Sequence, residues 1–92
     1  MKVHFFATYR QIIGGREIEI PAAPGLTVRA LVDALVARYP DLRREWLDEH
    51  GELYSHVHLF VNGRQFDFLP DGIQTGLTDA DVVKIFPPVG GG

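Results

Sequence analysis

The alternation of apolar and polar residues predicts a β-hairpin at the start of the chain. Residues 2–9 (KVHFFATY) are β-branched and aromatic and are apolar on both alternating faces, which is typical of a strand covered on both sides. Residues 12–15 (IIGG) supply a turn, and in residues 16–20 Ile18 and Ile20 alternate with charged positions. We therefore expect residues 2–20 to form a hairpin whose second strand is half exposed.

Helical spacing of apolar residues follows in residues 27–39. Thr27 can cap the N-terminus of this helix, and Pro40 stops it. A second, shorter turn, capped by Asp41, carries Trp46. Because aromatic residues at helical spacing are usually buried, we expect Trp46 to lie in the core rather than to stack on a ligand.

A second hairpin is predicted around Asn62 and Gly63, the strongest short-range signal for a two-residue turn between alternating runs. Residues 70–72 and 78–81 form further turns, and residues 82–86 (VVKIF) form the last strand. This buried strand is best placed beside the first one, with the helix packed on one face of a mixed sheet. The order of elements predicts an α+β protein with the β-grasp (ubiquitin-like) architecture: a domain at 1–88 and a flexible C-terminal glycine tail at 89–92.

Composition excludes several classes of function. The 92 residues suit one small domain, and the net charge of -3 gives no electrostatic reason to expect a nucleic-acid partner. Without cysteine the chain has no disulfide, thiolate metal site or persulfide. No apolar run reaches the ~20 residues that a membrane span needs, and the N-terminus lacks the apolar region of a signal peptide. We expect a cytoplasmic protein with neither a nucleic-acid nor a membrane partner.

Few residues carry a signal for catalysis. His56 and His58 are expected on one face of a strand, but no convincing third ligand accompanies them, so no metal site is predicted. Carboxylate pairs in turns serve local hydrogen bonds, residues 21–25 lack the glycine spacing and the lysine of a phosphate loop, and Ser55 has no triad context. We expect a protein that is not an enzyme and that binds no cofactor.

The sequence ends in VKIFPPVGGG, in which two prolines and three glycines follow a predicted buried strand. Prolines make a semi-rigid stalk, and glycines are narrow enough to enter a tunnel that any Cβ would obstruct. The terminal carboxylate becomes electrophilic once it is activated, for example by adenylation, and without cysteine it is the one place where sulfur could be carried, as a thiocarboxylate. A frayed end without a function is the alternative. The candidate tail residues are Pro87, Pro88, Val89, Gly90, Gly91 and Gly92.

Both ends of the chain resemble the molybdopterin synthase small subunit and hence the MoaD/ThiS family of ubiquitin-like sulfur carriers. The similar stretches are residues 2–15 (KVHFFATYRQIIGG) and residues 77–92 (LTDADVVKIFPPVGGG). The resemblance implies that Gly92 is adenylated by an ATP-using E1-like enzyme and then thiocarboxylated. It also implies a sulfur donor, either a sulfurtransferase or a cysteine desulfurase, and a larger acceptor subunit or synthase that holds the catalytic residues.

The middle of the chain leaves the recipient of the sulfur open. Residues 41–54 and the following HLFVNGRQFDFL look more like carriers that feed cysteine synthesis and like archaeal members of the family. The leading hypothesis is a carrier for molybdopterin synthesis; carriers for cysteine, thiamine or tRNA thiolation are alternatives. A ubiquitin-like modifier joined to lysines through Gly92 is the second hypothesis, and an interaction module with an idle tail is the third.

A partner protein must bind the domain at the same time as it binds the tail. Because the net charge is small, we expect apolar contact to supply much of the affinity between the two proteins. Five phenylalanines offer more aromatic surface than one small core can bury. We therefore predict a partner-binding patch on the sheet face opposite the helix, with Val89 at the root of the tail. Strand alternation predicts that two members, Phe66 and Phe68, share one face, and it leaves open whether that face is the outer face or the core face. The predicted patch residues are Phe6, Phe60, Phe66, Phe68 and Phe86.

Overall fold

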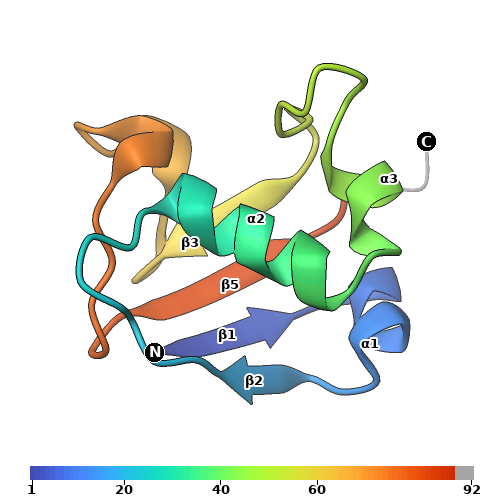
Figure 1. Cartoon of the computed structure of the whole chain (residues 1–92), viewed down its shortest axis with the longest axis horizontal. Helices are drawn as coiled ribbons and strands as arrows, with labels where there is room; N and C mark the ends of the chain where they lie inside the picture. The colour runs from blue at the N-terminus through green and yellow to red at the C-terminus, as the bar shows by residue number, and fades with distance from the viewer. Residues whose placement is uncertain (89–92) are drawn as a thin grey trace.

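The computed structural model describes residues 1–88, which form a five-stranded mixed sheet with helices on one face (Figure 1). The order of strands is β2-β1-β5-β3-β4, and β1 and β5 are parallel while the other neighbours are antiparallel. The strands are β1 (Lys2–Phe5), β2 (Glu17–Glu19), β3 (His58–Val61), β4 (Arg64–Gln65) and β5 (Val82–Phe86). The helices are α1 (Thr8–Ile13), α2 (Val28–Arg38), α3 (Leu42–Trp46) and the 3-10 turns η1 (Phe66–Phe68) and η2 (Gly72–Gln74).

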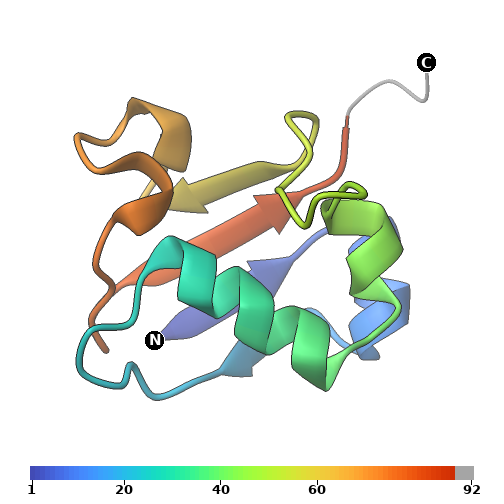
Figure 2. The same ribbon diagram turned by 45° about the horizontal axis from the view of Figure 1, so that its top comes forward.

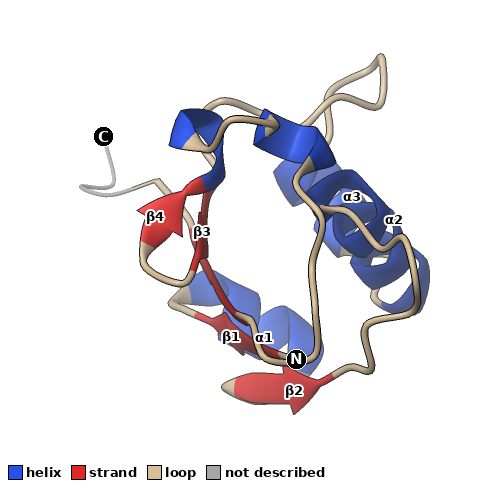
Figure 3. Ribbon diagram, turned by 90° about the vertical axis from the view of Figure 1, so that its left-hand side faces the viewer, coloured by secondary structure: helices blue, strands red, loops and turns tan. Residues whose placement is uncertain are grey.

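One hydrophobic core lies between the sheet and the helices α2 and α3, which cover the same face (Figure 3). Val3 and Phe5 of β1 and Val83 and Ile85 of β5 point into this core and are fully buried. The parallel pairing of β1 with β5 in the middle of the sheet, and one main helix on one face, confirm the predicted β-grasp architecture.

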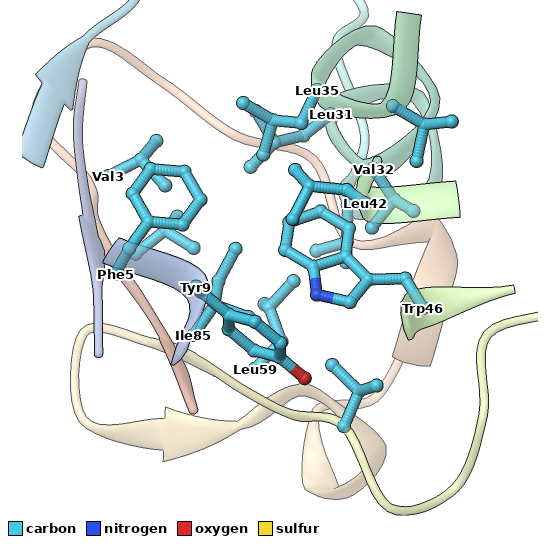
Figure 4. Packing of buried hydrophobic residues seen from close by; sticks show 14 of the residues in the cluster. Val3, Phe5, Tyr9, Leu31, Val32, Leu35, Leu42, Trp46, Leu59 and Ile85 are labelled. Carbon is cyan, nitrogen blue, oxygen red and sulfur yellow. The ribbon is translucent and has the colours of Figure 1, made fainter. Parts of the chain in front are cut away.

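The helix predictions are confirmed with one difference at α3. The Thr27 hydroxyl accepts a hydrogen bond from the Ala30 N–H at 3.1 Å and caps α2, whose apolar stripe is buried. Asp41 occupies the capping position of α3, but its side chain makes no capping hydrogen bond. Trp46 is fully buried, with its ring centroid 5.7 Å from that of Tyr9 in an edge-on contact (Figure 4), so it belongs to the core as predicted.

The first hairpin is shorter than predicted and contains a helix. β1 and β2 pair antiparallel, as expected, but β1 ends at Phe5 and the helix α1 replaces the rest of the predicted strand. The reason is packing, because the helical turn carries Tyr9 into the core, and Gly14 ends the helix at φ 77°. The prediction that both faces of β1 are covered is also wrong, since Lys2 is exposed on the outer face.

The prediction of the second hairpin is confirmed for its turn and wrong for its second strand. Asn62 and Gly63 have φ values of 52° and 87°, which is typical of the predicted two-residue turn. β4 is only two residues long, however, and the chain then enters η1. Because a 3-10 helix has three residues per turn, Phe66 and Phe68 do not share a face. Phe66 packs against the core, whereas Phe68 is 74% exposed.

A hydrogen-bond network at Asp81 ties the start of β5 to the β3–β4 turn. The Asp81 carboxylate accepts from the side-chain amide of Asn62 at 2.8 Å and from the Thr78 N–H at 2.7 Å. The Asn62 carbonyl oxygen in turn accepts from the Val82 N–H at 2.9 Å. These donors favour the ionised carboxylate, and the bond from Asn62 is the main reason that the pKa of Asp81 is lowered below 3.8.

This network predicts a pH-dependent contribution to stability. Because the pKa of Asp81 is lower in the folded than in the unfolded chain, its stabilisation is present above the unfolded pKa and is lost as the pH falls through the folded pKa. Asp81→Asn should therefore unfold at lower urea concentration than the wild type at neutral pH, and the difference should shrink below pH 3.8. Asp67→Asn is the control, because it removes an exposed carboxylate of η1. A difference that stays constant with pH would mean that the charge of Asp81 plays no part.

Candidate functional site

Three phenylalanines gather on the outer face of the sheet, the face that α2 and α3 do not cover. Alternation along β5 turns Val83 and Ile85 into the core and leaves Phe86 on the outer face. The Phe86 ring stacks on Phe6 with 4.1 Å between centroids and meets Phe60 edge-on at 5.6 Å. Phe86 is the last residue of β5, so this aromatic cluster (Phe6, Phe60 and Phe86) lies where the chain leaves the sheet towards its C-terminus.

An arginine from α1 closes one side of the aromatic cluster. The guanidinium carbon of Arg10 lies 5.0 Å from the centroid of the Phe6 ring, within the range of a cation–π contact. Its Nε donates a hydrogen bond to the carbonyl oxygen of Phe5 at 2.8 Å. Sequence reasoning did not single out Arg10, because it placed the preceding residues in an uninterrupted strand and so hid the turn that brings Arg10 back over β1.

The predicted patch of five phenylalanines is therefore brought together only in part. Phe6, Phe60 and Phe86 meet on the outer face, each partly buried. Phe66 packs against the core from η1, and Phe68 is exposed on the same turn. The prediction that these last two residues share one strand face was wrong because it assumed that the strand continued beyond Gln65.

The different surroundings of Phe66 and Phe68 predict different effects of truncation. Phe66→Ala should lower the free energy of unfolding by about 2 kcal/mol, less than the cost for a fully buried phenylalanine because the ring is only partly covered. Phe68→Ala should change it by less than about 0.5 kcal/mol, as exposed positions do. Urea unfolding of both variants measures the contrast. Equal losses in the two variants would contradict the placement of η1.

Pro87 and Pro88 are the first residues of the predicted tail and the last residues that the structure describes. β5 lies between β1 and β3 in the middle of the sheet (Figure 2). The tail therefore follows a strand that is hydrogen-bonded to a neighbour on each side. Pro87 is half-buried, and Pro88 is exposed. The remaining predicted tail residues, Val89, Gly90, Gly91 and Gly92, lie outside the described residues.

Comparison with known proteins identifies the family. Residues 3–92 match the sequence model of the ThiS family. The chain belongs to the ThiS family. Its members are small carrier and modifier proteins of the ThiS/MoaD type rather than enzymes, and E1-like enzymes activate them at the expense of ATP. This agrees with the expectation from the sequence that the chain is not an enzyme.

Archaeal proteins are among the individual relatives of this chain. The chain is 39% identical over 92 residues to small archaeal modifier protein 3 of Haloferax volcanii, covering 100% of this chain and 98% of the relative. The crystal structure of SAMP1 from the same organism superposes with a TM-score of 0.85 at 29% identity, covering 100% and 98% of the two chains. A structure from Pyrococcus furiosus provisionally assigned as molybdopterin converting factor subunit 1 has a TM-score of 0.74 at 35% identity, covering 96% and 95%.

The histidines do not form the arrangement that the sequence suggested. His56 precedes β3 in a turn and stacks on Tyr54 at 4.8 Å between ring centroids, so it does not share a strand face with His58. His58 lies in β3, and its Nδ1 is 3.3 Å from the side-chain nitrogen of Gln65. Within residues 1–88 no group of three or more histidine, aspartate or glutamate side chains could hold a metal ion, and no helix is long and apolar enough to cross a membrane.

Proposed function

We propose that this ThiS-family protein is a ubiquitin-like modifier and sulfur carrier that acts through the carboxylate of Gly92. The observation that carries the proposal is the similarity over the full length to a small archaeal modifier protein, in a chain whose sequence ends in three glycines. Cytoplasmic activation by an E1-like enzyme that uses ATP is the setting in which this carboxylate would react.

Two outcomes of the same activation are chemically open to Gly92. The carboxylate displaces pyrophosphate from ATP and forms an acyl adenylate. Attack by a lysine amine releases AMP and forms an isopeptide bond, which makes the protein a modifier. Attack by sulfide, supplied by a sulfurtransferase or a cysteine desulfurase system, releases AMP and leaves a thiocarboxylate, which makes the protein a carrier for a larger acceptor.

The described residues support this use of the C-terminus. The tail starts from the central strand of the sheet, and the half-buried Pro87 follows the aromatic cluster directly. We propose that Phe6, Phe60 and Phe86 contact the partner while the glycines enter its active site, because partly exposed aromatic clusters commonly mark interfaces. The glycines Gly90, Gly91 and Gly92 carry no Cβ that would obstruct a narrow tunnel.

A carrier for molybdopterin synthesis is the second candidate function. The similarity to the Pyrococcus furiosus structure supports it, at 35% identity over nearly the whole chain. The two archaeal modifiers favour conjugation instead, and SAMP3 is the relative with the higher identity. We therefore place molybdopterin synthesis behind the modifier function.

Mass spectrometry tests the proposal. The purified protein is incubated with ATP, the E1-like enzyme of its own organism and a sulfide donor, and its intact mass is followed. We expect an adenylate and then a mass increase equal to the exchange of one oxygen for sulfur. Peptides from cells that carry the Gly92 remnant on lysine would support the modifier, while a thiocarboxylate without conjugates would support the carrier. Absence of both products with an active enzyme would refute the proposal.

A further inference from the structure

The turn that joins β1 to α1 contains a strained residue. Ala7 has φ 53° and ψ -129°, a combination that glycine adopts readily but that a Cβ disfavours. Among the non-glycine residues of the described chain, Asn62 also has a positive φ, but it lies in a two-residue hairpin turn that requires this value. Backbone strain persists only where neighbouring contacts hold it, and the contacts around Ala7 therefore indicate what the strain maintains.

Arg10 and Phe6 hold the Ala7 turn from the side of the tail. The Nε of Arg10 satisfies the carbonyl oxygen of Phe5, at the point where β1 ends, with a 2.8 Å hydrogen bond. The guanidinium group also covers the Phe6 ring, which stacks on Phe86 at 4.1 Å. Arg10 is thus connected to the last residue of β5 through one aromatic ring.

The core holds the same turn from the other side. Tyr9 follows the strained residue by two positions, is 1% exposed and meets Trp46 edge-on. Its N–H donates to the carbonyl oxygen of Phe6 at 3.2 Å, and the N–H of Arg10 donates to that of Ala7 at 3.1 Å. Residues 5–10 therefore form a clamp, fixed to the core by Tyr9 and to the outer face by Arg10.

We propose that Arg10 is a positioning residue for the activation of the tail: it keeps the strained Ala7 turn closed, holds Phe6 on Phe86 and so fixes the direction in which the chain leaves the sheet at Pro87. This inference rests on the proposed activation at Gly92. Without Arg10, relaxation of Ala7 lets Phe6 move away from Phe86. The carboxylate then reaches its activating site in fewer productive orientations, which lowers the rate of reaction more than the affinity of the domain.

A simpler role for Arg10 makes a different prediction. Arg10 is only partly buried, and as a surface cation it could pair directly with a carboxylate of the activating enzyme. Loss of such an ion pair raises KM, and no change at Ala7 would restore it. If Arg10 acts through the clamp, Ala7→Gly should compensate for the loss of Arg10, because glycine adopts the φ and ψ of Ala7 without strain.

Kinetics of activation with the full chain separate the two roles. The variants are Arg10→Met, Ala7→Gly and the double variant, and Arg38→Met is the control because it removes a similar guanidinium–ring contact, 5.2 Å above Tyr39 at the end of α2. With the carrier as the varied substrate in ATP-dependent pyrophosphate release, Arg10→Met should lower kcat roughly tenfold, as misplaced reacting groups do, and should raise KM by a smaller factor because Phe6 is also a proposed partner contact. Ala7→Gly and Arg38→Met should behave as the wild type, and the double variant should recover most of the lost kcat.

Hydrogen exchange of the protein alone gives a readout that needs no partner. The amides of Tyr9 and Arg10 should exchange faster in Arg10→Met than in the wild type or in Arg38→Met, and the double variant should restore their protection. A raised KM without rescue, an unchanged kcat in Arg10→Met, or unchanged exchange at these amides would each overturn the inference. If the wild type itself is not activated, the proposed function fails, and the exchange rates still decide whether the clamp exists.

Discussion

Removal of Gly91 and Gly92 is expected to abolish adenylation and transfer while leaving the melting temperature unchanged. The chemistry proposed for this protein needs the carboxylate at the end of a glycine strip, and a chain that ends at Gly90 presents its carboxylate two residues too early to reach the same point in a partner. The core residues of the described chain lie between Met1 and Ile85, so the deletion removes none of them. Intact-mass analysis after incubation with the activating enzyme measures the loss, and thermal unfolding measures the fold.

A matched control shows whether this effect belongs to the glycines rather than to any change on the surface. Phe68→Ala alters the largest exposed apolar side chain of the described residues, but it lies on η1 and outside the aromatic cluster. It should be adenylated like the wild type if that cluster and the tail are the contacts that matter. A fall in melting temperature on deletion would mean that the tail packs on its own domain, contrary to the proposal.

Elements whose pattern is set by local chemistry were predictable from the sequence. The capping hydroxyl of Thr27, the periodic apolar residues that follow it and the stop at Pro40 describe α2 almost to its ends. Asn62 and Gly63 predict their turn because few other residue pairs adopt two positive φ values in succession. The placement of β5 beside β1 follows because both strands are apolar on the face that the helices cover.

Elements set by tertiary contacts were not predictable. Residues 6–9 have the composition of a strand, yet Tyr9 reaches Trp46 only if the chain turns at Ala7, in a conformation that no residue preference would suggest for alanine. Gln65 ends β4 for a similar reason, since the next residue packs into the core from a 3-10 turn. In both places packing of a side chain into the core overrode the strand propensity of the local sequence.

The candidate site also contains residues that the sequence could predict and one that it could not. Phe6 and Phe86 were predicted as candidates because the phenylalanines of this chain offer more aromatic surface than one small core can bury, and the parallel pairing of β1 with β5 brings the two into contact. Arg10 could not be assigned to them, because its role depends on a turn that the sequence pattern did not indicate. Hence the sequence identified the three phenylalanines that meet on the outer face, and the structure added the contact of Arg10 with one of them.

Trp46→Ala is expected to have the largest effect on stability of any single substitution in this domain. The side chain is fully buried and contacts Phe5 and Tyr9, with ring centroids 6.4 Å and 5.7 Å from its own. Replacement of a buried tryptophan by alanine costs about 3–5 kcal/mol. Since small domains have only about 5–15 kcal/mol in total, Trp46→Ala should lose a large fraction of the stability and melt well below the wild type. Circular dichroism during thermal unfolding measures this, because the variant lacks the only tryptophan of the chain.

Trp46→Phe separates the packing of the ring from its polar atom. The indole Nε1 is buried, and although the Tyr9 hydroxyl lies nearby, no group within residues 1–88 meets it in good hydrogen-bond geometry; an unsatisfied buried donor costs about 1–3 kcal/mol. Phenylalanine removes that donor and keeps most of the ring, so we expect Trp46→Phe to lose less than half of what Trp46→Ala loses. It should also keep Tyr9 in place and therefore preserve the exchange protection of the clamp. Equal destabilisation by the two variants would contradict this expectation. It would mean that Nε1 donates a hydrogen bond in solution and that this bond stabilises the fold in addition to the buried surface of the indole ring.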